Sequence, residues 1–153
     1  FQEAFQGWGE RAPHAGLAHA CAARALMADD RDPAAHWAMG RALWLRGGHD
    51  AALPELEHAV ALSPNFAVGH YTLAFVHAQT GDAATALAAS DRSRLLSPFD
   101  PMLFGMLGAR AMALVRLGRY DEAADWGLRA AARPNAHAHI HGIAVYALSM
   151  AGR

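Results

Sequence analysis

The sequence contains no lysine, because all 13 of its basic residues are arginine. A Schiff-base lysine and a phosphate-loop lysine are therefore excluded as catalytic or nucleotide-binding groups. The single cysteine, Cys21, excludes an intramolecular disulfide and is typical of a reducing, cytoplasmic compartment. Since Cys21 lies in an alanine-rich run, we expect it to be a small buried side chain.

Charge and hydropathy argue against two further classes of partner. The formal net charge is −1, so we expect no basic surface for nucleic acid and no general attraction to anionic membranes. No apolar run reaches the roughly 18 residues that predict a membrane span, and no signal peptide opens the chain. The first residue is Phe1 and not methionine, and we expect the chain to be a piece of a longer protein.

Alanine is abundant, at about a quarter of the residues, whereas β-branched residues are sparse. Alanine is the best helix former and strands favour β-branched side chains, so an all-α fold is expected. No serine sits in a strand–turn–helix elbow, and no glycine-rich phosphate loop occurs. We therefore expect no enzyme activity and no cofactor.

An internal repeat organises the sequence. Pro64 and Pro98 are 34 residues apart, and each follows a serine. Gly47 and Gly81 have the same separation. Between these positions apolar residues recur at three- and four-residue steps, which is typical of one face of a helix. Each unit is therefore predicted to be a helix, a glycine turn, a second helix and a proline stop.

The repeat resembles the tetratricopeptide repeat (TPR) family, whose signature combines aromatic, small, glycine and proline positions at fixed offsets. The matching positions in the first unit are His36, Met39, Gly40, Leu43, Gly47, Ala52, Leu56, Ala59 and Pro64. Those in the second unit are His70, Leu73, Ala74, His77, Gly81, Ala86, Ser90, Ser93 and Pro98. The resemblance implies an all-α, right-handed α-solenoid of about nine helices, in which each repeat packs on its neighbours.

A single TPR domain is expected to cover residues 1–153. Its parts are a partial repeat at 1–32, full repeats at 33–66 and 67–100, a repeat with a longer first helix at 101–135, and a final first helix or capping helix at 136–153. The third repeat breaks the period, because Pro98 and Gly118 are 20 residues apart whereas Pro64 and Gly81 are 17 apart. Its first helix is therefore expected to be about a turn longer, or to follow a longer loop. Residues 1–8 are predicted to end a further helix.

In TPR proteins the first helices of the repeats line a concave groove that holds a segment of a partner protein. The resemblance places these candidates there: Trp37, Arg41, Trp44, Tyr71, Phe75, Gln79, Met112 and Arg116. Large aromatic residues and arginine dominate binding energy at interfaces, although the aromatics could instead pack between helices as core. The lysine and asparagine clamp of chaperone-tail receptors is missing, so an apolar or amphipathic helix is the expected ligand.

Residues 96–135 also resemble the TPR region of bacterial adenylate-cyclase-like or winged-helix transcriptional regulators. The residues that carry this resemblance are the run SPFDP and the long third repeat. It implies a regulatory interaction module of a larger bacterial signalling or transcription-regulating protein. The partner segment would come from another protein or from the same polypeptide.

The histidine-rich end of the chain keeps a sensor function open as an alternative. His137, His139 and His141 alternate along what we predict to be the start of a helix, where His137 and His141 would share one face and His139 would point elsewhere. No cysteine or metalloprotease-type glutamate accompanies them, so no metal site is assigned. Self-association through the terminal helices is a further alternative.

Three other histidines occupy aromatic positions of the TPR signature. His36, His70 and His77 are expected to be core or half-buried side chains. Burial lowers the pKa of a histidine, so protonation would cost stability and make this part of the chain sensitive to pH.

Overall fold

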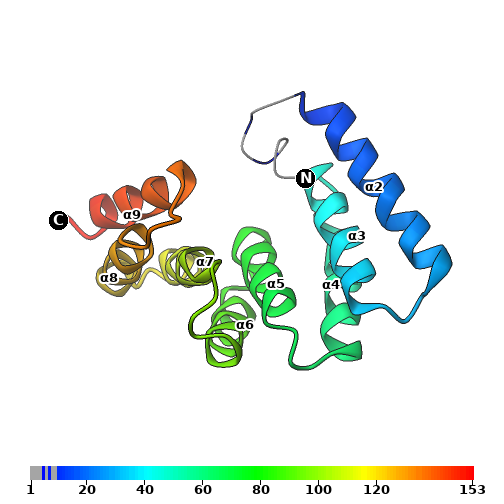
Figure 1. Ribbon diagram of the computed structural model, residues 1–153. Helices are drawn as coiled ribbons and strands as arrows, with labels where there is room; N and C mark the ends of the chain where they lie inside the picture. Colours follow the sequence, from blue (N-terminus) through cyan, green and yellow to red (C-terminus); the bar gives the residue numbers. More distant parts are fainter. Residues whose placement is uncertain (1–4, 6, 8–9) are drawn as a thin grey trace. The chain divides into compact units, whose positions relative to one another are not determined.

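The computed structural model describes residues 5, 7 and 10–153 of the chain. In this part of the chain every regular element is a helix, and Figure 1 follows them in chain order. The helices are α2 (Arg11–Ala28), α3 (Pro33–Leu45), α4 (His49–Leu62), α5 (Ala67–Thr80), α6 (Ala83–Leu96), α7 (Leu103–Arg116), α8 (Tyr120–Ala131) and α9 (Ala138–Met150).

These eight described helices confirm the predicted all-α solenoid class and are close to the nine expected. The predicted helix end at residues 1–8 falls largely on positions 1–4, 6 and 8–9, which lie outside the described residues. The chain divides into two compact units, residues 1–69 (unit 1) and 70–153 (unit 2), and the division falls inside α5.

Glycine turns separate the two helices of each repeat, as predicted. Gly47, Gly81 and Gly118 have φ values of 86°, 108° and 71°, in the left-handed region that glycine adopts without a steric penalty. After α3, the Gly48 N–H donates to the carbonyl of Leu43 at 3.0 Å. This is the 6→1 hydrogen bond of a Schellman motif at the helix C-terminus.

Aspartates precede α3 and α6, and serine–proline pairs follow the ends of α4 and α6. The Asp32 carboxylate accepts from the Ala34 N–H at 2.8 Å ahead of α3, and Asp82 accepts from the Thr85 N–H at 3.0 Å ahead of α6. That backbone hydrogen bond also lowers the pKa of Asp82. Helices α4 and α6 both stop two residues before a proline. The predicted proline stops are therefore confirmed.

The third repeat is longer than the others because of the segments on either side of its first helix, and not because of the helix itself. Helix α7 has 14 residues, the same number as α5, so the expectation of a longer first helix is wrong and that of a longer loop holds. Asp100 organises the loop, because its carboxylate accepts from the Met102 N–H at 2.8 Å and its carbonyl accepts from the Leu103 N–H at 2.9 Å.

In unit 1, α3 packs against both α2 and α4. Helix α4 turns Ala52, Leu56 and Ala59 inward at helical spacing, and all three have 0% exposure. Gly40 of α3 faces them closely, since a Cβ built there would lie 2.6 Å from Leu56 Cγ. The small residue at this signature position therefore permits the close approach of the two helices.

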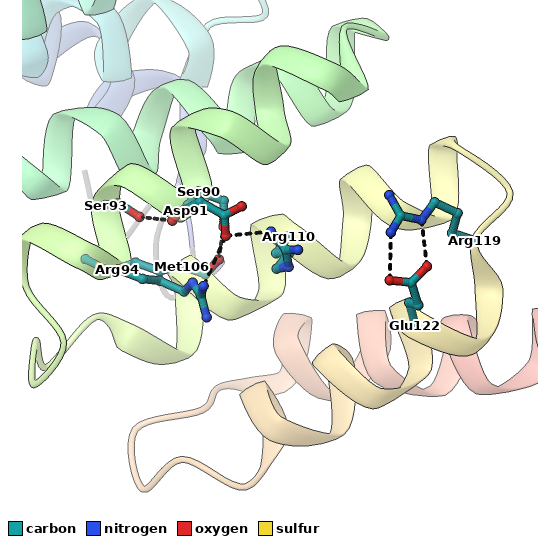
Figure 2. A network of polar contacts seen from close by, with 8 residues as sticks. All are labelled: Ser90, Asp91, Ser93, Arg94, Met106, Arg110, Arg119 and Glu122. Atoms are coloured by element: carbon teal, nitrogen blue, oxygen red, sulfur yellow. Dashed lines mark hydrogen bonds and ion pairs between the residues drawn. The ribbon is translucent and has the colours of Figure 1, made fainter.

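In unit 2, α7 packs against α6, α8 and α9 and carries the largest buried face. Ser90 and Ser93 of α6 are fully buried at signature positions. The Ser90 hydroxyl donates to the Met106 carbonyl of α7 at 2.9 Å, and the Ser93 hydroxyl donates to the Ser90 carbonyl at 2.8 Å (Figure 2). Both buried hydroxyls are thus satisfied, as burial of a polar group requires.

Cys21 is exposed on α2, so the expectation of a buried cysteine is wrong. The buried positions of this helix are Ala15 and Ala22, seven residues apart on one face, and Cys21 precedes that face by about 100°. No described helix, α2 included, combines the length and the apolar character needed to cross a membrane.

Candidate functional site

The candidate binding residues of unit 1 meet around Trp37 of α3. The Arg41 guanidinium lies over the Trp37 ring, 4.5 Å from its centroid, one helical turn further along the same face. The rings of Trp37 and Phe66 are nearly perpendicular, at 79°, with centroids 5.9 Å apart. Trp37 and Arg41 are both half-buried, so this group is in part packing and in part surface.

Trp44, the third candidate in unit 1, lies two turns after Trp37. Its ring stacks on that of His49 at 6.3 Å with an interplanar angle of 26°, and lies 5.9 Å from the ring of Phe5. It also packs against the small buried cluster of Ala15 and Leu45. The sequence signature did not single out Phe66 or His49, because both stand outside its fixed offsets.

Two candidates of unit 2 pack against neighbouring helices. A Cβ at Gly105 of α7 would lie 2.6 Å from Tyr71 Cζ, so the tyrosine ring rests directly on that glycine. Met112 packs on a buried alanine cluster that includes Ala78 and Ala113. Both are only half-buried, as is Phe75. These side chains therefore combine core packing with some exposed surface.

Arg116 caps the C-terminal end of α5 with its side chain. Its Nε donates to the Ala78 carbonyl at 3.0 Å, and its Nη2 donates to the Gln79 carbonyl. These are among the last carbonyls of α5, which have no partner within the helix. Arg116 and Gln79, both candidates for the groove, are in contact through the Gln79 carbonyl, and the guanidinium is held by main-chain oxygens.

His36 is bridged on both sides of its ring. Its Nδ1 lies 2.7 Å from Glu55 Oε2, and its Nε2 lies 2.8 Å from the carbonyl oxygen of Asp30. Burial lowers the pKa of His36, but the hydrogen bonds and the charges of Glu55 and Asp30 together outweigh it and raise the pKa above 6.5. The expectation that burial would lower the pKa is therefore wrong for His36.

A raised pKa in the folded state means that protonated His36 stabilises the fold. This stabilisation is complete below pH 6.5, the ordinary value, and is lost as the pH rises through the raised value. We expect His36→Gln to lower the free energy of unfolding more at pH 6 than at pH 9, in urea titrations followed by circular dichroism. His19→Gln on α2 is the control for removal of a histidine. An equal loss of unfolding free energy at both pH values would contradict a stabilising interaction of protonated His36 with Glu55 and Asp30.

The histidine-rich end is arranged differently from the prediction. His137 precedes α9 as its N-cap residue, with extended φ and ψ of −97° and 173°, so the helical face it was expected to share with His141 does not include it. Its ring instead contacts those of His139, at 5.3 Å, and Phe104, at 5.2 Å. Burial, and then the nearby His139 and His141, lower the pKa of His137. Within the described residues no three histidine, cysteine or carboxylate side chains are grouped as metal ligands.

Comparison with known families matches three segments of the chain to the tetratricopeptide repeat, at residues 33–58, 67–92 and 107–126. Each segment covers a glycine turn with all or part of its flanking helices, α3–α4, α5–α6 and α7–α8. The chain is therefore a tetratricopeptide repeat protein, and its fold is that of a protein–protein interaction scaffold. The more specific resemblance to adenylate-cyclase-like or winged-helix regulators is not borne out by these matches.

Solved structures share the fold. MamA AMB-1 aligns with a TM-score of 0.70 at 23% identity, over 99% of this chain and 85% of that one. MamA MSR-1 gives 0.68 at 23%, over 99% and 82%. A kinesin light chain of Podosopora anserina, with nearly identical TPR-like repeats, gives 0.67 at 15%, over 99% and 82%. At these identities the likeness concerns the fold alone. No curated protein matches the sequence significantly.

Proposed function

We propose that the chain binds a helical segment of a partner protein on the face of α3 that carries Trp37, Arg41 and Trp44. The observation that supports this most is the Arg41 guanidinium held over the Trp37 ring, 4.5 Å from its centroid. Half-buried tryptophan and arginine fixed by packing offer large contact area at a low cost in side-chain entropy. An apolar or amphipathic helix would cover the rings and leave its polar side in water.

By itself, unit 2 would offer a second surface of the same kind through the half-buried side chains of Tyr71, Phe75, Gln79 and Met112. Arg116 would act indirectly, by fixing the end of α5 through the carbonyls of Ala78 and Gln79. We further propose that the chain serves as the regulatory part of a larger cytoplasmic bacterial protein. Its partner segment would come from another protein or from the same polypeptide.

The proposal is tested with a fluorescein-labelled amphipathic helical peptide, selected on the unaltered chain from a peptide library. We expect Trp37→Ala to raise the dissociation constant in fluorescence anisotropy by roughly 30-fold, as is typical of a central interface tryptophan. Arg41→Gln keeps the contact between Trp37 and Phe66 and should raise it by roughly threefold to fivefold. Tyr71→Ala reports the contribution of unit 2.

Met27→Ala is the control, because Met27 is 87% exposed on α2 and lies outside the proposed face. Circular dichroism must show unchanged helicity in every variant, since Trp37 also packs on Phe66. If both Trp37→Ala and Tyr71→Ala bind the peptide as tightly as the unaltered chain, the proposed face is not the binding site.

A further inference from the structure

Three arginines converge on a single tryptophan in unit 2. The guanidinium carbon atoms of Arg94 on α6, Arg110 on α7 and Arg129 on α8 lie 4.6, 4.7 and 4.7 Å from the centroid of the Trp126 ring. Trp126 is half-buried and Arg129 is exposed. Three helices therefore bring their positive charges to one aromatic ring at a place that a ligand can reach.

This group has more positive than negative charge. Asp91 of α6 accepts from Arg94 at 3.0 Å and from Arg110 at 2.6 Å, as Figure 2 shows. Among the described residues Arg129 makes no hydrogen bond or ion pair, so its contact with Trp126 leaves the guanidinium edge unused. The group thus holds three guanidinium groups and one carboxylate, and that carboxylate pairs with only two of them. We call Asp91, Arg94, Arg110, Trp126 and Arg129 the Trp126 cluster.

The hydrogen-bonding capacity of these arginines is not used up within the cluster, and two nearby acids of α8 have arginine partners outside it. The Nε atoms of Arg94 and Arg110 are buried without a hydrogen-bond partner in the structure, which is costly for charged donors. Two acids that precede Trp126 on α8 are paired outside the cluster. Glu122 binds Arg119 through two contacts of 2.6 and 2.7 Å (Figure 2), and Asp125 binds Arg153 at 2.8 Å.

The acidic residues of α8 also limit which anions can bind at the cluster. The hydrogen bond from Arg119 lowers the pKa of Glu122, and the charge of Arg110 lowers it further, so Glu122 is ionised close to the cluster. With Asp121 and Asp125 it makes α8 acidic beside the cluster, which disfavours a polyanion such as nucleic acid. A single anionic group fits the local charge, and a planar carboxylate fits the fork of donors on a guanidinium.

We propose that the Trp126 cluster binds one glutamate or aspartate side chain from an otherwise uncharged segment of a partner protein. The carboxylate accepts from the open edge of the Arg129 guanidinium, and Trp126 holds that guanidinium in place by cation–π stacking. The residues of this site lie on α6, α7 and α8, and none of them is among the proposed helix-binding residues, which lie on α3, on α5 and at Met112 of α7. The site therefore goes beyond the proposed function and does not depend on it.

The test uses the blocked peptide Ala-Leu-Glu-Leu-Ala and its matched partner Ala-Leu-Gln-Leu-Ala, titrated into the ¹⁵N-labelled chain and followed by NMR. We expect the glutamate peptide to shift the Trp126 indole and Arg129 Nε signals along a saturable curve. The glutamine peptide should bind at least about tenfold more weakly, because only a charge-assisted bond is removed. Arg129→Gln should weaken the glutamate peptide by about tenfold.

Arg133→Gln is the matched control, since Arg133 follows α8, is exposed and is outside the cluster. It changes the net charge by the same amount and should alter the binding of the glutamate peptide by less than about twofold. Equal binding of the two peptides would overturn the proposal, as would an equal effect of Arg129→Gln and Arg133→Gln. Tighter binding of inorganic phosphate than of the glutamate peptide would overturn the carboxylate assignment.

Discussion

Replacing Gly127 with alanine is expected to lower the free energy of unfolding by about 2–3 kcal/mol. Gly127 lies on the face of α8 that packs against α9, and a Cβ there would be 2.9 Å from the Cα of Ala144. No rotamer change can relieve a clash with a main-chain atom, so α9 has to move away from α8. This cost exceeds the gain of about 1 kcal/mol that alanine brings to a helix interior. Urea denaturation followed by circular dichroism measures the change.

The matched control is Gly142→Ala on α9, the partner helix. Beyond the backbone of its own helix and its chain neighbours, a Cβ at Gly142 would have no atom within 4 Å, and its φ is not in the left-handed region. Only the gain in helix propensity remains there, so this variant should be more stable by about 0.5–1 kcal/mol. The same substitution in adjacent helices thus has opposite signs. A Gly127→Ala chain as stable as the unaltered one would show that α8 and α9 are not in such close contact.

The helical hairpins could be predicted because the residues that start and stop the helices act locally. Gly47 and Gly81 supply left-handed backbone at a spacing of 34 residues, and this separation is visible in the sequence without knowledge of packing. The serine–proline pairs stop the second helices for an equally local reason. The sequence left open whether the third repeat has a longer first helix or a longer loop before it. The hydrogen bonds that Asp100 accepts in this loop leave no mark on the spacing of the apolar residues, so the hydrophobic pattern could not decide between the two.

Properties that depend on which side chains meet across helices could not be predicted in this way. The pKa of His36 is raised by Glu55, 19 residues away, whereas the burial expected from the repeat signature acts in the opposite direction. The Trp126 cluster draws on three helices, and nothing in the spacing of its arginines along the chain indicates a common target. Arg116 was expected to face a partner, and its carbonyl acceptors on α5 are 37 and 38 residues away.

The candidate groove could be predicted only in part. The family signature identifies the helix face to which Trp37 and Arg41 belong, because that face follows from position within the repeat. It does not indicate how much of each side chain is used in packing. Phe66 against Trp37 and Gly105 against Tyr71 are contacts between residues that the signature treats separately.

Leu114→Ala is expected to lower the free energy of unfolding by about 3–4 kcal/mol, near the middle of the range for buried leucines. Leu114 lies in α7 with 0% exposure, and its fully buried neighbours are Ala123, Ala124 and Ala147. The larger neighbours of this cluster, Leu87, Trp126 and Leu148, are only partly buried, and the alanines have no rotamers with which to fill the space. Much of the cavity therefore remains, and its cost adds to that of the lost apolar burial.

Leu128→Ala on α8 is the control for Leu114→Ala, because Leu128 is 43% exposed and its truncation opens no enclosed cavity. It should cost about 1 kcal/mol or less. Urea titrations of both variants, analysed with a common slope, measure the difference. A cost for Leu114→Ala no greater than that of Leu128→Ala would mean that α8 and α9 close over the cavity. In that case the alanine-rich interface between the helices would deform readily, and the penalty expected for Gly127→Ala should shrink in the same chain.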